Sequence, residues 1–200
     1  IGFREAGKKV SITAISVGGP EVDATLKKAL AIGADDAVRI NAHPSDAAFV
    51  AQQIASYAEG KEFDLIFTGK ESIDFNGAMV PGMIAEHLKM PFVSFATYMD
   101  MKDDNTAELK REVDGGVEAL EVQLPAVISC QKGIAEWRIP NMRGIMAARK
   151  KPFSTIDPSD SGQGTETVKL APPPAKGETQ YFEPDNAKAL VTALVDNGLI

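Results

Sequence analysis

Segments typical of β-strands alternate with segments typical of α-helices over the first half of the chain, and this alternation constrains the fold most. Apolar, often β-branched runs predict four strands, at residues 10–17, 37–40, 64–68 and 92–96. Apolar spacing and end signals predict three intervening helices: one from Pro20 to Gly33, one capped by Ser45 or Asp46, and one near Ala78 to Leu88. The pattern predicts an α/β fold with a mostly parallel sheet and helices on both faces.

The loops after Val17 and Thr68 are the first candidates for a binding site, because parallel sheets bind ligands at the carboxyl ends of their strands. The loop at residues 69–77 follows a buried strand and precedes a helix, whose N-terminus offers amide groups and a positive dipole end to a phosphate. Gly69 and Gly77 permit close approach of a ligand to the backbone. An ordinary connecting loop is the alternative.

The second half has a different organisation. The Asp-Gly turn at residues 114–115 predicts a β-hairpin between two strands, and another apolar strand follows at residues 126–130. From Pro152 to Pro184 the chain is rich in Pro, Ser and Gly, which indicates a linker or an extended arm, and a last amphipathic helix starts at Asp185. We therefore expect a nucleotide-binding domain at residues 1–151, and an arm with a terminal helix at residues 152–200. That helix packs on its own domain or on a partner subunit.

Composition excludes several function classes. The net charge of −7 opposes a general nucleic-acid binder, and no apolar run approaches the ~18 residues of a membrane span. Two histidines and one cysteine predict neither a metal cluster nor a disulfide framework, and we interpret Cys130 as a small buried residue rather than a nucleophile. The motifs of serine hydrolases, zinc proteases and P-loop proteins are missing, so we expect no catalytic residues.

Several segments resemble the electron transfer flavoprotein β subunits, in the order and with nearly the spacing of that family. The loop GKESID, at residues 69–74, is similar to the family's G-K-Q-A-I-D. The other matching segments are LKKALAIGAD at 26–35, REVDGGVE at 111–118, LPAV at 124–127 and IMAARKKP at 145–152. The resemblance implies an adenine nucleotide alpha hydrolase-like fold.

The resemblance also implies a function. The family forms heterodimers with an α subunit that carries the electron-transferring FAD, while the β subunit holds AMP or, in electron-bifurcating members, a second FAD. The complex passes electrons from flavin dehydrogenases, such as those of the acyl-CoA type, to an acceptor such as a quinone oxidoreductase. We therefore expect an electron carrier subunit rather than an enzyme. A stand-alone adenine-nucleotide-binding regulator of the universal-stress-protein kind is the alternative.

Carried over by position, the resemblance implies two sites. The nucleotide site comprises Val17, Gly69, Lys70, Ser72, Asp74, Asn76, Gly77, Ala78, Met79 and Val80. Many AMP-binding members have Asn-Gln-Thr at the last three of these positions, so this chain lacks three polar side chains there. The partner-docking segment comprises Arg138, Met142, Arg143 and Ile145.

Met142 takes the place of the exposed leucine that anchors dehydrogenases in the family. Ringed by arginines, it makes an apolar anchor for docking; a core methionine beside solvated arginines is the alternative. The chain starts at Ile1, and its first residues are typical of a helix that leads into a strand. We expect the family's N-terminal strand and loop to be absent from it, and, without a visible targeting segment, a location in the bacterial cytoplasm.

Overall fold

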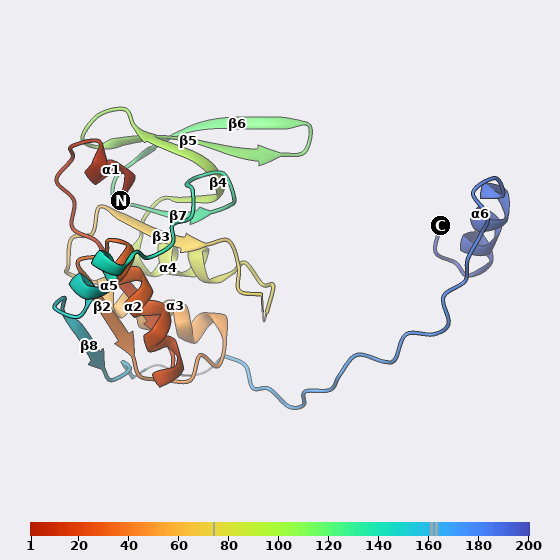
Figure 1. Cartoon of the computed structure of the whole chain (residues 1–200), viewed down its shortest axis with the longest axis horizontal. Coiled ribbons are helices and arrows are strands. Elements are labelled where there is room, and N and C mark those ends of the chain that lie inside the picture. Colours follow the sequence, from red (N-terminus) through yellow and green to blue (C-terminus); the bar gives the residue numbers. More distant parts are fainter. Residues whose placement is uncertain (74, 161, 163) are drawn as a thin grey trace. The chain divides into compact units, whose positions relative to one another are not determined.

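The computed structural model describes residues 1–73, 75–160, 162 and 164–200, and its chain course is shown in Figure 1. The chain divides into two compact units, Ile1–Glu166 and Thr167–Ile200. The first unit contains two β-sheets and their covering helices, and it carries both predicted sites. The two units are described separately.

The first sheet is fully parallel and has the order β1-β2-β8. Its strands are β1 (Thr13–Val17), β2 (Asp36–Ile40) and β8 (Phe153–Ile156). Val17 and Ile156 both pair with Ile40 at the carboxyl end. The sequence analysis placed residues 153–156 in an extended arm. They form a strand instead because Phe153 and Ile156 pack into the hydrophobic clusters of this sheet.

The second sheet is mixed and has the order β3-β7-β4-β5-β6. Its strands are β3 (Leu65–Gly69), β4 (Phe92–Met101), β5 (Thr106–Val113), β6 (Gly116–Gln123) and β7 (Ala126–Cys130). Strands β3 and β4 run parallel to β7, while β5 and β6 form an antiparallel hairpin in which Val113 pairs with Gly116. This confirms the predicted hairpin, drawn in green at the top of Figure 1, and Gly115 supplies its positive φ of 89°.

The predicted helices are present, with small shifts at their ends. Those of the first unit are α1 (Gly2–Glu5), α2 (Asp23–Ile32), α3 (Ala47–Ala58), α4 (Val80–Leu88) and α5 (Met142–Ala148). A 3-10 turn, Pro20–Val22, leads into α2. The Asp46 carboxylate caps α3 by accepting a hydrogen bond from the Phe49 amide at 2.7 Å.

Helices cover both faces of the first sheet because its strands are apolar on both sides. Leu26 and Leu30 of α2 pack against Ala37 on one face. Phe49 of α3 packs against Val17 and Ile40 on the other. A further cluster, made of Ala51, Ile84, Ala85 and Val127, joins α3 and α4 to the second sheet. The α/β class with parallel strands and covering helices is thus confirmed.

The second unit contains the predicted terminal helix, α6 (Ala187–Asp196). The Asn186 side chain caps it by accepting a hydrogen bond from the Ala189 amide at 3.3 Å. Leu190, Val191 and Val195 are exposed on this helix. Within the described residues, no helix combines the length and the hydropathy that crossing a membrane requires.

Candidate functional site

The loop between β3 and α4 is a compact turn. The Ser72 carbonyl accepts a hydrogen bond from the Asn76 amide at 2.8 Å, and the Ser72 hydroxyl accepts one from the Phe75 amide at 3.3 Å. Asn76 and Ala78 adopt positive φ angles of 47° and 49°. Left-handed conformations of this kind are uncommon for residues with a side chain. The sequence therefore folds here into a tight path from the end of β3 to the start of α4.

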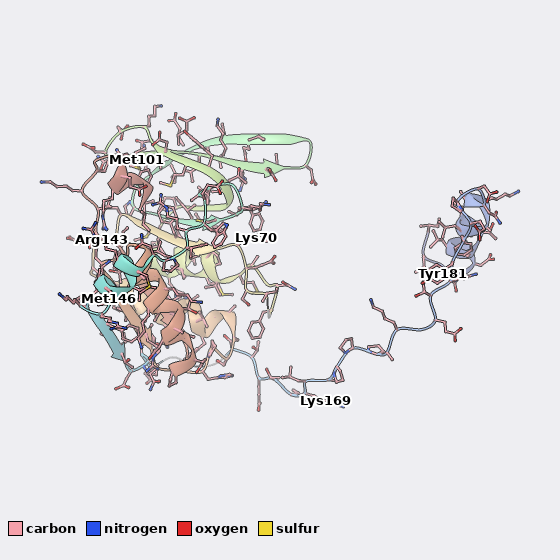
Figure 2. The ribbon with its side chains drawn as sticks, viewed as in Figure 1. Lys70, Met101, Arg143, Met146, Lys169 and Tyr181 are labelled. Atoms are coloured by element: carbon pink, nitrogen blue, oxygen red, sulfur yellow. The ribbon has the colours of Figure 1, made fainter. Side chains whose placement is uncertain are left out.

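Lys70 follows β3 directly and is marked in Figure 2. Its ammonium lies 2.9 Å from a carboxylate oxygen of Glu71, and about half of each side chain or less is exposed. The neighbouring carboxylate offsets part of the charge that Lys70 would present to a phosphate. An anion at this loop therefore competes with Glu71 for the lysine.

The predicted nucleotide-site residues come from both sheets. Gly69 ends β3, and Lys70, Ser72, Asn76 and Gly77 lie in the β3–α4 loop, whereas Val17 ends β1 in the other sheet. Asp74 lies outside the described residues. The Val17 side chain is only 8% exposed and packs in the core, so only its backbone is placed to serve a ligand.

The three residues where the loop meets α4 are apolar in this chain. Ala78 and Met79 end the loop, and the Met79 side chain is 52% exposed. Val80 packs against the α3–α4 core cluster. Pro81, in the first turn of α4, has no amide hydrogen to offer. Polar side chains for a phosphate must therefore come from other parts of the loop, and the start of α4 offers backbone amides alone.

The hydroxyl of Thr68, at the carboxyl end of β3, is buried and has no hydrogen-bond partner among the described residues. A buried polar group without a partner costs free energy unless a water or a ligand supplies one. The adjacent strand ends at Cys130, where burial raises the pKa of the thiol to about 11. The thiol is therefore protonated at neutral pH, which argues against a nucleophile, although Cys130 is half-buried rather than buried as we expected.

Sequence reasoning missed Arg39, a buried cation at the carboxyl end of β2. Its guanidinium lies 2.8 Å from the Asp23 carboxylate and donates hydrogen bonds to the Gly18 carbonyl at 3.3 Å and the Asn41 side chain at 2.7 Å. It also donates to the Thr155 hydroxyl of β8. An arginine inside an apolar strand was the available signal, because a buried charge needs partners.

The predicted partner-docking segment forms α5. The Asn141 side chain caps this helix by accepting a hydrogen bond from the Gly144 amide at 2.8 Å. The Met142 side chain is 73% exposed, so it is not a core residue, and Ile145 and Met146 are exposed as well. Figure 2 marks Arg143 and Met146 on this helix, which lies beside α2.

Arg138, one of the predicted docking residues, forms an ion pair with Glu5. Its guanidinium makes two hydrogen bonds to the carboxylate of Glu5 in α1, one of them at 2.7 Å. The hydrogen bond from Arg138 lowers the pKa of Glu5 below its ordinary value. Within the described residues, Arg143 and Arg149 have no such carboxylate partner.

The fold is that of α/β proteins that bind ligands where parallel strands end. The family model "Electron transfer flavoprotein domain" matches residues 2–161. The chain therefore belongs to the electron transfer flavoprotein family and is similar to its β subunits. This confirms the resemblance inferred from the sequence motifs.

The curated relatives agree with this assignment. The chain is 35% identical over 198 residues to the electron transfer flavoprotein subunit beta of Bacillus subtilis, a match that covers 92% of this chain and 77% of the relative. It is 33% identical over 197 residues to the protein of the same name from Syntrophomonas wolfei, covering 98% and 77%. The human protein of that name is 30% identical over 198 residues, covering 94% and 76%.

Proposed function

We propose that this chain works as the β subunit of an electron transfer flavoprotein, paired with an α subunit that carries FAD. The observation that carries the proposal is the family match, which spans nearly all of the first unit. A bound flavin accepts and donates the electrons, and the protein supplies its binding and surroundings. The complex takes electrons from a flavin dehydrogenase and delivers them to an acceptor such as a quinone oxidoreductase. No observation favours the stand-alone regulator.

The β3–α4 loop is our proposed site for AMP or a second FAD within this subunit. The first amides of α4, those of Val80 and Gly82, lie at a helix N-terminus, where amides have no carbonyl partner within the helix, and they suit a phosphate group. Lys70 adds a cation that Glu71 partly offsets. With Ala78, Met79 and Val80 at the helix start, phosphate binding depends on the backbone rather than on polar side chains.

A substitution at Gly77 tests the assignment of the nucleotide to this loop. A Cβ at Gly77 would have ordinary contacts of 3.8 Å with Met79, so Gly77→Val is compatible with the protein's own packing. If a nucleotide lies against this glycine, the valine should abolish retention of the β-subunit nucleotide through purification while the melting temperature stays within a few degrees. Unchanged nucleotide content would place the nucleotide elsewhere.

Met142 is our proposed anchor for the dehydrogenase, with Arg143 and Ile145 beside it. Exposed apolar side chains next to an arginine that has no ion pair with any described residue suit a protein interface whose apolar centre is surrounded by charges. The heterodimer, with an acyl-CoA dehydrogenase as electron donor, provides the test.

Met142→Ala should raise the KM for the heterodimer roughly tenfold and leave kcat and the melting temperature nearly unchanged. The truncation removes contact area at the interface but none in the core, since the side chain is exposed. A large loss of melting temperature with normal electron transfer would contradict the docking role.

A further inference from the structure

A groove of about 520 Å³ lies between α2 and α5, beside the docking segment. Its lining includes four apolar residues that we call the floor: Ala24 and Ala31 of α2, Ile145 of α5 and Phe153 of β8. Three cations of the lining, which we call the rim, are Lys27, Lys28 and Arg149, and the Lys27 ammonium lies 5.7 Å from the centre of the Phe153 ring. Figure 1 shows α2 and α5 next to each other on the flank of the first unit.

The two helices approach closely at a single glycine. A Cβ added to Gly144 would lie 2.3 Å from the carbonyl oxygen of Ala31. The helices therefore touch backbone to backbone there, and the small side chains of Ala24 and Ala148 leave the space beside this contact unfilled. The groove is thus a consequence of how α5 packs on α2.

The rim is positively charged although the chain as a whole carries a net charge of −7. No described residue that lines the groove is acidic, and Lys27, Lys28 and Arg149 have no ion-pair partner among the described residues. Lys151, also in the lining, instead donates hydrogen bonds to the Leu30 and Ala34 carbonyls at the end of α2, at 2.9 and 2.6 Å. Charge complementarity therefore favours an occupant with several negative charges.

The apolar surface is larger than the groove itself. Ile145 lines the groove, and Met142 and Met146 of the same helix are exposed beside it, as is Ile139 just before the helix. A single carboxylate ligand would use one or two of the rim cations and leave this surface uncovered. An extended occupant with both apolar and acidic residues would cover all of it.

We propose that the α2–α5 groove receives an acidic, amphipathic segment of the dehydrogenase that donates electrons. Apolar side chains of that segment fill the floor over Ala24 and Ala31, and its carboxylates lie against Lys27, Lys28 and Arg149. The proposal rests on the proposed function, since it assigns a second contact to the partner that Met142 anchors. It extends the docking surface from α5 onto α2.

The test measures reduction of the heterodimer by an acyl-CoA dehydrogenase, with KM and kcat determined separately. The variants are Lys28→Glu and Arg149→Glu, which reverse rim charges, and Ala24→Phe, which fills the floor without changing charge. Lys61→Glu, in the turn that follows α3 and outside the lining, is the matched charge control. Lys28→Gln and Arg149→Gln replace the reversals if melting shows that these disturb the fold.

Each groove variant should raise the KM about tenfold while kcat stays at the wild-type value, and Lys61→Glu should behave as wild type. Higher salt should reduce the KM difference between wild type and the two charge-reversal variants, because salt screens charges. It should leave the KM difference between wild type and Ala24→Phe unchanged. If the groove variants match wild type while Met142→Ala still raises the KM, the groove inference is overturned and the proposed anchor stands. If Met142→Ala also leaves the KM unchanged, the proposed docking on α5 is contradicted as well.

Discussion

Arg39 links four segments of the first unit through one buried guanidinium. It joins β2 to the Gly18 backbone after β1, to Thr155 of β8, and to Asp23 at the start of α2. The carboxyl ends of the three strands are therefore fixed together by hydrogen bonds as well as by the sheet. Because Arg39 is buried and the Asp23 side chain is only 27% exposed, a substitution that removes the guanidinium leaves the Asp23 carboxylate without a counterpart.

Arg39→Ala should lower the free energy of unfolding by about 3 kcal/mol, since breaking a buried ion pair leaves an uncompensated charge. Arg111→Ala is the matched control, because the Arg111–Glu118 pair of the hairpin is more exposed and should contribute less than about 1 kcal/mol. Urea unfolding of both variants measures the difference. An equal decrease in the free energy of unfolding for both variants would contradict a special role for Arg39.

The carboxyl group of Asp46 should make the structure around the start of α3 depend on pH. Hydrogen bonds from the Phe49 amide and then the Thr165 amide lower the pKa of this carboxyl below its ordinary value of 3.8. Because the folded-state pKa is depressed, the stabilisation is present above the unfolded-state pKa and is lost as the pH falls through the folded-state pKa. The cap of α3 and the contact with residues 164–165 should therefore weaken in acid.

The backbone amide NMR signals of Phe49 and Thr165 should titrate together, with a midpoint below 3.8. Asp46→Asn is the control, because an asparagine still caps a helix but does not ionise in this range. Its amide signals should not show that titration. A wild-type midpoint at or above 3.8 would contradict the account.

Two glycines inside helices show how the elements pack. Gly144→Ala should destabilise the protein by about 1–3 kcal/mol, because the methyl group would meet the backbone of Ala31 and push α5 away from α2. Gly82→Ala in α4 is the matched control, since its nearest neighbour is a Phe92 ring carbon at 3.6 Å. That change should be neutral or stabilising, by up to about 1 kcal/mol. Thermal melting measures the difference, and a change of melting temperature in the same direction for both variants would contradict this packing.

The elements that local chemistry defines could be predicted from the sequence. The strands and helices of the first half follow from apolar spacing, and the hairpin follows from Asp114 and Gly115. Strand β8 could not be predicted, because four residues after Pro152 carry too short a pattern and become a strand only by pairing with β2. The pairing of Arg138 with Glu5 joins residues 133 positions apart, so no local pattern indicates it.

For the whole molecule, family membership could be inferred from short motifs, whereas the distribution of strands over two sheets could not. Which strands pair depends on contacts between distant segments, and β1 and β3 look alike as isolated apolar runs. Val17 and the β3–α4 loop lie in different sheets, and their sharing one nucleotide site stays a prediction. The exposure of Met142 likewise depends on how α5 packs against α2.

The central claim is that this chain pairs with an α subunit to form a flavin-carrying complex. The most direct measurement is to co-express the two chains, purify the complex, release its nucleotides by denaturation, and count FAD and AMP. We expect a heterodimer that contains one FAD, together with either one AMP or a second FAD in the β subunit. A chain that forms no complex with the α subunit, or a complex that contains neither nucleotide, would contradict the account.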